Sequence, residues 1–313
     1  MIVSKDFQHE SRIVCLYRTC YPIFKPPKRS DVMTTIKAIG SLCVTDSDGY
    51  IINHADWNKI NPIFLPVIND VIHTYRTLLQ DDLHSIYIRG SIPKGIGIEG
   101  VADLDTIAVT KQNPKKQQVK RIKEVEQALT QNHHCVDGNE LSVYGKEDIL
   151  NTTSFSIISF ILQTHSICVF GEDLIPRLPR YKADEALAND HLIHLQGQIK
   201  NACDDLQDNS DREDIKDCCK WIMKIIVRAG LALVITKENT YTRDLYPAYK
   251  RFSEYFPDRE SDMRRALEYA ITPIIDTNVL LLFLNEFGTW MVSEADKWLQ
   301  FYNPTRELNM KIV

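Results

Sequence analysis

The stretch from Ile86 to Val109 constrains the fold of this chain more than any other part of the sequence. An apolar segment, Ile86-Tyr87-Ile88, ends in Arg89-Gly90-Ser91. After eleven intervening residues, Asp103-Leu104-Asp105 opens a second apolar segment. A Gly-Ser turn that follows a strand presents backbone N–H groups and a hydroxyl to phosphate oxygens, and glycine lets the backbone approach them closely. The pattern predicts two strands joined by a phosphate-binding turn.

Two acids follow this turn at the start of the second strand. Asp103 and Asp105 are two residues apart, so both side chains point to one face of an extended segment. Two carboxylates on one face suit Mg²⁺ that also binds nucleotide phosphates. Glu140 opens a third strand-like segment, and we expect it to bind a second metal ion or to take a proton from an attacking hydroxyl. Asp137 competes for this role but lies in a predicted turn.

The same loop also matches the spacing of a dinucleotide-binding fingerprint, in Gly95-Ile-Gly97-Ile-Glu-Gly100. That fingerprint needs a helix directly after the glycines and an acid about 20 residues further on. Here a strand follows, and the region 117–120 holds no acid. We therefore reject dinucleotide binding.

Hydrophobic periodicity divides the rest of the chain. Segments 62–79 and 115–130 read as helices, one on either side of the strand pair, and 36–52 reads as a hairpin. After about residue 150 the pattern is helical, over 153–165, 183–206, 212–236, 244–256, 259–270 and 276–301. The predicted fold class is α/β followed by all-α: a mixed sheet with flanking helices over 33–150 and a helical bundle over 151–313. Residues 1–32 read as an extension, with Met33 as an alternative start.

Composition limits the class of protein. The net charge is −5, so the chain lacks the overall basic charge of a dedicated nucleic-acid binder. The sequence has no secretory signal and no apolar run of membrane-spanning length, and its eight cysteines form no paired or zinc-binding pattern. We expect a cytoplasmic protein with free thiols and no membrane partner.

The motif Ile88-Arg89-Gly90-Ser91 with Asp103-Leu104-Asp105-Thr106 resembles the signature of the polymerase-β-like nucleotidyltransferase superfamily. The resemblance is nearest to its streptomycin/spectinomycin adenylyltransferase branch and covers roughly residues 80–270. It implies a nucleotidyltransferase domain followed by a helical domain, with ATP as co-substrate and two Mg²⁺ ions held by Asp103, Asp105 and Glu140. In those enzymes an acid at the position of Glu140 is the catalytic base, and 164–171 connects a helix to a loop.

The resemblance also assigns two cations to the ATP phosphates, Arg228 and Arg243. Lys224 lies four residues before Arg228 on the same helix face and could join them. The alternatives are a solvent-exposed cation at Arg228 and a local pair between Arg243 and Asp244. Gly90 and Ser91 complete the expected nucleotide-binding set.

Two departures from the family concern its substrate. Ala102 replaces the usual serine before the first aspartate, and only about ten residues separate Tyr144 from Phe155, where the antibiotic enzymes have a longer segment with drug contacts. The expected activity is Mg²⁺-dependent transfer of AMP from ATP to a hydroxyl of a small molecule, with release of pyrophosphate. The alternatives are a non-catalytic nucleotide-binding module and an enzyme acting on protein or tRNA. The sequence does not indicate the oligomeric state.

Overall fold

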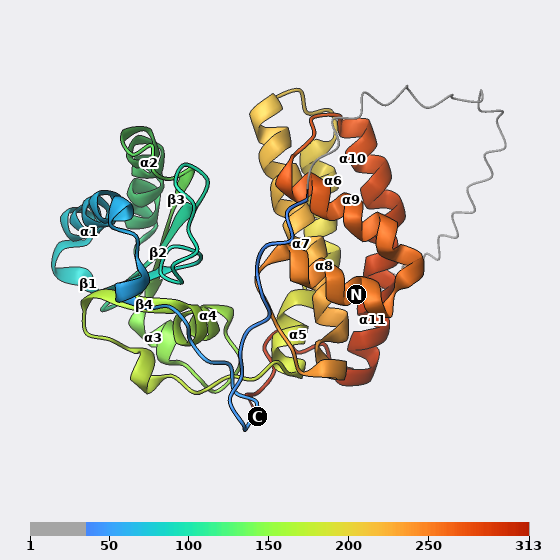
Figure 1. Cartoon of the computed structure of the whole chain (residues 1–313), viewed down its shortest axis with the longest axis horizontal. Helices are drawn as coiled ribbons and strands as arrows, with labels where there is room; N and C mark the ends of the chain where they lie inside the picture. Colours follow the sequence, from blue (N-terminus) through green and yellow to red (C-terminus); the bar gives the residue numbers. More distant parts are fainter. Residues whose placement is uncertain (1–35, 313) are drawn as a thin grey trace, which may run out of the picture. The chain divides into compact units, whose positions relative to one another are not determined.

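A mixed four-stranded sheet in the order β3-β2-β1-β4 carries the motif segment (Figure 1). In this computed structural model, β1 (Leu83–Arg89) pairs antiparallel with β2 (Asp103–Thr110) and with β4 (Ser166–Gly171), while β2 pairs parallel with β3 (Gly138–Gly145). The structure describes residues 36–312, which belong to one compact unit. The prediction for residues 1–32 lies outside the described residues.

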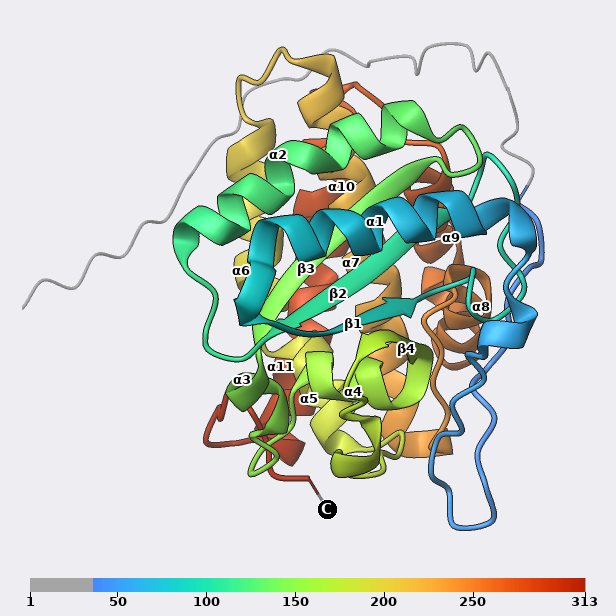
Figure 2. The same cartoon turned by 90° about the vertical axis from the view of Figure 1, so that its left-hand side faces the viewer.

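Alternating side chains give the sheet two apolar faces. Ile86, Ile88, Leu104 and Ala108 pack in one hydrophobic core with α1 (Leu65–Leu79) and α2 (Lys116–Asn132). Figure 2 shows both helices across the same face of the sheet. The expectation of one helix on either side of the strand pair is therefore wrong, because the apolar stripes of both helices are buried against one face.

The opposite face of the sheet shares its core with the helices that follow. Tyr87, Ile107 and Val109 belong to the same hydrophobic cluster as Phe160 of α4 (Ile157–His165) and the buried side of α7 (Arg212–Glu238). This shared core links the sheet to the helical part of the chain. The division into domains at residue 150 stays a prediction, and β4 lies beyond it in the chain.

Helix α7 is the centre of the helical part and contacts α5, α6, α8, α9 and α11. It begins where Asp211 accepts hydrogen bonds from the backbone N–H groups of Glu213 and Asp214, and it ends at Asn239, whose φ of 52° is left-handed. The remaining α-helices are α3 (Lys146–Leu150), α5 (Glu185–Leu192), α6 (Leu195–Leu206), α8 (Leu245–Tyr255), α9 (Glu260–Ile271), α10 (Thr277–Phe283) and α11 (Thr289–Tyr302). Short 3₁₀ segments span Trp57–Lys59, Pro62–Phe64, Gln80–Asp82, Ile175–Arg177 and Pro257–Arg259, and a π-helical turn spans Leu284–Gly288.

Three further segments differ from their sequence-based predictions. Residues 164–171 form the end of α4 and strand β4, not a helix and a loop, since the segment pairs with the free edge of β1. The predicted helix over 183–206 breaks between α5 and α6. The hairpin over 36–52 is reduced to one antiparallel bridge, Thr45 with Ile51, around the predicted turn at 46–49, while Tyr50 bridges to Lys182.

No helix among the described residues is long and apolar enough to cross a membrane. Six of the eight cysteines lie in this part of the chain, and all six are free thiols: Cys43, Cys135, Cys168, Cys203, Cys218 and Cys219.

Candidate active site

The turn after β1 brings the backbone against the acidic strand. Gly90 has a φ of +90°, which glycine adopts without strain, and a Cβ atom at this position would lie 2.7 Å from Oδ2 of Asp105. Ser91 follows, and its carbonyl oxygen accepts a hydrogen bond of 3.1 Å from the backbone N–H of Ile96. A short closed loop thus holds Gly90 and Ser91 beside Asp105. The glycine-rich loop leads into β2, as predicted, and not into a helix.

The predicted acids occupy neighbouring positions on two parallel strands. Asp103 and Asp105 lie on β2, and Glu140 on β3 is the register partner of Asp105. Side chains at paired positions of neighbouring strands lie on the same face of the sheet. Asp103 stands two residues from Asp105 on that face, and its Oδ1 lies 3.0 Å from where a Cβ on Gly138 would be. The structure therefore brings all three predicted acids to one end of the sheet.

The two central carboxyls have opposite pKa shifts. Burial raises the pKa of Asp105 to about 6, with the negative charges of Glu140 and Asp103 adding to the rise and Arg89 opposing it. Burial also acts to raise the pKa of Glu140, but the charge of Arg89 and the hydrogen bonds from Asp105 and Arg89 outweigh it, so the net shift is downward. Glu140 is the carboxyl that stays ionised, and a proton resides more readily on Asp105.

Arg89 joins these carboxyls and was not among the predicted site residues. Its Nη2 donates a hydrogen bond of 2.8 Å to Oε1 of Glu140, and its Nη1 lies 3.4 Å from Oδ2 of Asp105. The Arg89 side chain is only 13% exposed. The sequence holds a signal for Arg89, because it directly precedes the Gly-Ser turn. This position makes it the last residue of β1, where it pairs with Asp105 across the antiparallel ladder.

Two neighbouring cavities open on this group of side chains. The smaller, of about 160 Å³, is lined by Gly90, Ser91, Lys94, Asp105 and His165 among others. The larger, of about 280 Å³, is lined on one side by Glu140, Ser142 and Tyr144 of β3 and on the other by Asp190, His191 and Gln198. Arg89, Ile161, Arg228 and Arg243 line both cavities.

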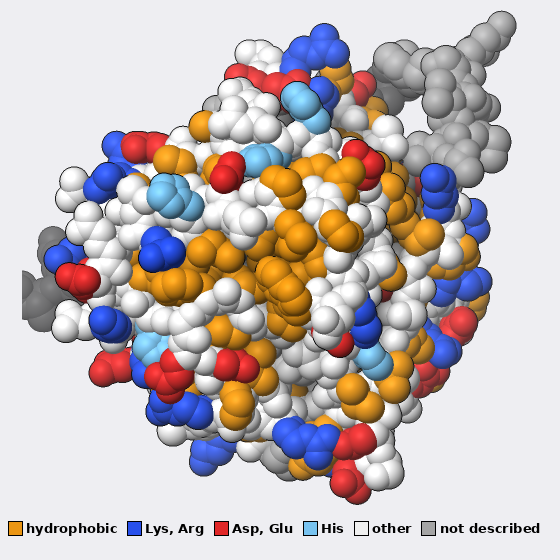
Figure 3. Space-filling model, turned by 60° about the vertical axis from the view of Figure 1, so that its left-hand side comes forward, with side chains coloured by type: hydrophobic (Ala, Val, Ile, Leu, Met, Phe, Trp, Pro, Cys, Tyr) orange, Lys and Arg blue, Asp and Glu red, His pale blue; other side chains and the backbone are white. Residues whose placement is uncertain are grey.

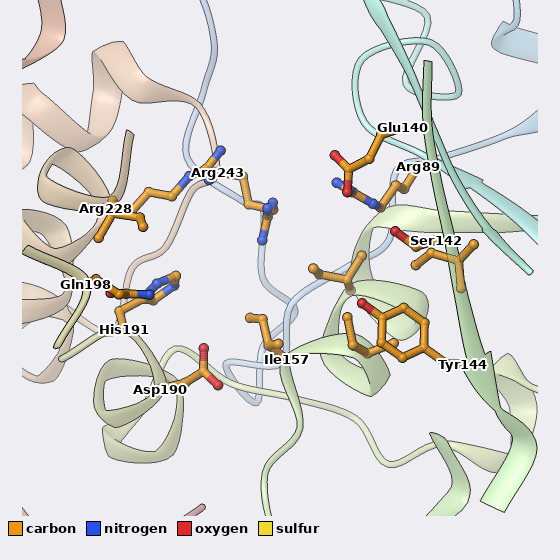
Figure 4. A pocket seen from close by; sticks show the side chains of 14 residues that line it. Arg89, Glu140, Ser142, Tyr144, Ile157, Asp190, His191, Gln198, Arg228 and Arg243 are labelled. Atoms are coloured by element: carbon orange, nitrogen blue, oxygen red, sulfur yellow. The ribbon is translucent and has the colours of Figure 1, made fainter. Parts of the chain in front are cut away.

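Two arginines from the helical part lie across the larger cavity from Glu140 (Figure 4). Arg228 comes from α7 and Arg243 from the segment just before α8. Burial lowers the pKa of Arg228 to about 10, with repulsion from Arg243 adding to the effect, and its buried Nε has no hydrogen-bond partner among the described residues. Arg228 is therefore not a solvent-exposed cation. Within the described part of the chain neither arginine forms an ion pair with a carboxylate, Asp244 included.

Lys224 lies one turn before Arg228 on α7 and lines neither cavity. Burial lowers its pKa, and Lys220 and Arg228 add to the lowering, while the charges of Asp103 and Asp105 act in the opposite direction. Lys224 is thus close enough to the acidic end of the sheet to feel its charge. It does not contribute to the wall of the cavities.

Lys94 and His165 also line the smaller cavity, and neither was predicted, but only Lys94 adds a positive charge to it. Burial lowers the pKa of His165 well below its ordinary value, and Lys94, Arg243 and Arg89 lower it further, so this imidazole is neutral. Four cationic side chains, Arg89, Lys94, Arg228 and Arg243, line this cavity against two carboxylates, Asp105 and Asp244. Its electrostatic character suits a polyanion.

The carboxylates at the end of the sheet are the candidate ligands for Mg²⁺, which the sequence resemblance implies. The described residues contain no group of three or more His, Cys, Asp or Glu side chains arranged to hold a metal ion. Asp105 and Glu140 nevertheless present adjacent carboxylates, and the charge of Glu140 adds to the rise that burial causes in the pKa of Asp105. Mg²⁺ commonly binds one or two protein carboxylates and completes its shell with phosphate oxygens and water. The chemistry of this pair therefore fits Mg²⁺ that arrives with a nucleotide.

Comparison with known proteins finds likeness among solved structures. No family model and no curated protein sequence matches the chain. The structure is similar to that of a spectinomycin adenyltransferase, AAD(9) from Enterococcus faecialis with ATP and spectinomycin, at 16% sequence identity and a TM-score of 0.45. The match covers 74% of this chain and 98% of that one.

Proposed function

We propose that this chain is a Mg²⁺-dependent nucleotidyltransferase that transfers AMP from ATP to a hydroxyl of a small molecule. The observation that carries the proposal is the placement of opposite charges across the two cavities. Asp105 and Glu140 stand on the sheet, and Arg228 and Arg243 stand opposite without an anionic partner among the described residues. A largely buried cation such as Arg228 is costly without a partner, and a bound triphosphate would neutralise both arginines.

The smaller cavity supports a position for the triphosphate. The backbone at Gly90 and Ser91 and the cations Lys94, Arg228 and Arg243 line it together. Arg228 and Arg243 would hold the β- and γ-phosphates and stabilise the charge that develops on the leaving pyrophosphate. Positioning and charge stabilisation supply most of the rate in phosphoryl transfer.

Glu140 is the proposed general base. Its pKa is lowered by Arg89 and by hydrogen bonds, so it is ionised near neutral pH and accepts the proton of the acceptor hydroxyl. The hydroxyl oxygen forms a bond to the α-phosphorus, the bond between the α-phosphorus and the bridging oxygen to the β-phosphate breaks, and pyrophosphate leaves with that electron pair. Asp103 and Asp105, with Glu140, would hold Mg²⁺. When bound, the metal neutralises charge on the phosphates and on the attacking oxygen.

The surface supports a small acceptor in preference to RNA. On the face drawn in Figure 3, Lys and Arg side chains lie singly or next to acidic ones around an apolar centre. The run of lysines and arginines over residues 111–123 is exposed to solvent on and before α2. A strongly salt-dependent affinity for tRNA would contradict this preference.

The experiment follows the label from α-labelled ATP with Mg²⁺ in the presence of an aminoglycoside panel and, separately, an extract of the host. Transfer to a drug identifies antibiotic adenylylation. Transfer of the label only to a host metabolite, protein or RNA supports nucleotidyl transfer and identifies an acceptor other than an antibiotic. Nucleotide binding without transfer in either mixture contradicts the enzyme and favours the non-catalytic binding module.

Two variants test the assigned carboxylates in the same assay. Asp103→Asn and Asp105→Asn are each expected to reduce transfer by roughly two orders of magnitude or more, as expected when metal-assisted charge stabilisation is lost. Asp81→Asn is the matched control, because Asp81 is exposed just before β1. A folded Asp105→Asn protein that retains half of the wild-type activity would refute the metal assignment.

A further inference from the structure

The larger cavity has an apolar wall that the transfer chemistry does not require. Five isoleucines line it, from the sheet, from α4 and from α7: Ile107, Ile157, Ile158, Ile161 and Ile225. Tyr144 lies beside them and shows its ring toward the cavity in Figure 4. An apolar wall of this kind binds an apolar body by removing it from water.

Asp190 is the single carboxylate on the helical side of this cavity. It lies near the end of α5, and Figure 4 shows its carboxylate directed toward the space between α5 and β3. Among the described residues the Asp190 carboxylate accepts no hydrogen bond and forms no ion pair. Burial raises its pKa to about 6, while Arg243 acts to lower it. Its neighbour His191 is buried and neutral, with Nε2 3.2 Å from the hydroxyl of Tyr241. The cavity thus contains one desolvated anion without a partner.

The charges around the cavity oppose a polycation. Arg89, Arg228 and Arg243 line it against Glu140 and Asp190, and Arg89 already pairs with Glu140. In the chain without nucleotide, a ligand with several ammonium groups would find one free carboxylate and repulsion from Arg228 and Arg243. A ligand with one ammonium group finds a matched partner in Asp190.

We propose that the larger cavity is the acceptor subsite and that it takes a compact amine with an apolar body, its ammonium on Asp190 and its hydroxyl directed to Glu140. This inference rests on the proposed function for the role of Glu140. It departs from the polycationic, highly hydroxylated antibiotics that the sequence resemblance implies. The cavity volume of about 280 Å³ suits a molecule of one ring or of similar size.

Binding of three probes to the full chain tests the proposal at pH 7.5 by isothermal titration calorimetry. Tyramine carries the amine, the apolar ring and the hydroxyl, 4-ethylphenol lacks only the amine, and streptomycin is the polycation. Tyramine is expected to bind about tenfold more tightly than 4-ethylphenol, since a charge-assisted hydrogen bond has this effect. Asp190→Asn is expected to abolish the difference and to leave 4-ethylphenol binding unchanged. Asp217→Asn, at an exposed position on α7, is the control and is expected to preserve it.

Several results would overturn the subsite: no tyramine binding to wild type, tighter binding of streptomycin than of tyramine, or an unchanged preference for the amine in Asp190→Asn. Competition between tyramine and an ATP analogue with a methylene group between the α- and β-phosphorus would also overturn it, because the nucleotide would then fill this cavity. The analogue separates the two proposals. Failure of the analogue to bind, with Asp190-dependent tyramine binding intact, contradicts the nucleotidyltransferase and not the amine site.

Discussion

Arg89 donates a hydrogen bond of 2.8 Å to Glu140, from the last residue of one strand to the proposed base on another. The same guanidinium group lies 3.4 Å from Asp105. One cation therefore acts on both central carboxyls, and its charge lowers the pKa of each, against the rise that burial causes. Arg89 is the residue that keeps the proposed base ionised.

Arg89→Met should move the acidic limb of the pH profile of kcat/KM to higher pH. Without the guanidinium group the pKa of Glu140 rises. At pH 6 a larger fraction of the base is then protonated and inactive in the variant than in the wild type, while at pH 9 the base is ionised in both. The loss near neutral pH is expected to be roughly 10- to 100-fold, as for other residues that orient a reacting group. Arg89→Lys retains the charge and should shift the limb less. An equal loss at every pH would show that Arg89 acts only on structure.

Gly90→Ala and Gly49→Ala form a matched pair. Both glycines have left-handed backbone, with φ of +90° and +84°, but an added Cβ at Gly90 meets Asp105 at 2.7 Å and one at Gly49 meets nothing within 4 Å. Each variant should lose about 1 kcal/mol of unfolding free energy from backbone strain. Only Gly90→Ala should also lose transfer activity, because it displaces Asp105. Urea unfolding and the labelled-ATP assay measure the two effects. Equal activity in the two variants would contradict the close approach of the turn to Asp105.

Local chemistry explains why the acidic end of the sheet could be predicted from the sequence. The Gly-Ser turn and the two-residue spacing of Asp103 and Asp105 fix which groups share a face, without knowledge of distant segments. The prediction that Glu140 lies on a strand beside Asp105 is confirmed by the register of β2 and β3. The roles of these residues remain proposals.

Features that depend on distant segments could not be predicted in the same way. The segment Ser166–Gly171 is apolar and also fits the end of a helix, and it becomes β4 only because the edge of β1 offers unpaired backbone groups. Lys94 and Asp190 enter the cavities from a loop and from α5, and no local pattern marks either of them as part of a site. Their contribution depends on the hydrophobic core that the sheet shares with α4 and α7.

Arg228→Met should change stability and nucleotide affinity in opposite directions. The buried guanidinium group has an unpartnered Nε, so a similarly long apolar side chain should raise the unfolding free energy by roughly 1 kcal/mol. The same change should weaken ATP binding by about 10- to 100-fold, because it removes a charged hydrogen-bond donor. Arg212→Met, at the exposed first turn of α7, is the control and should change neither quantity appreciably. A variant that is less stable but binds ATP normally would contradict the phosphate-binding role.

Asp190→Asn should stabilise the protein at pH 7.5 and have less effect at pH 4.5. Burial raises the pKa of Asp190 from an ordinary value of 3.8 to about 6, so the folded state favours the protonated carboxyl. The stability that the Asp190 carboxyl contributes is therefore fully present below its pKa in the unfolded chain, about 4. This stability is lost as the pH rises through the pKa in the folded protein, about 6. The neutral amide avoids this loss, and the gain at pH 7.5 relative to pH 4.5 is expected to be between about 1 and 3 kcal/mol. Urea unfolding of wild type and variant at both pH values measures the difference, and Asp217→Asn provides the exposed control. A gain that is the same at both pH values would mean that Asp190 is already paired or solvated in the unliganded protein.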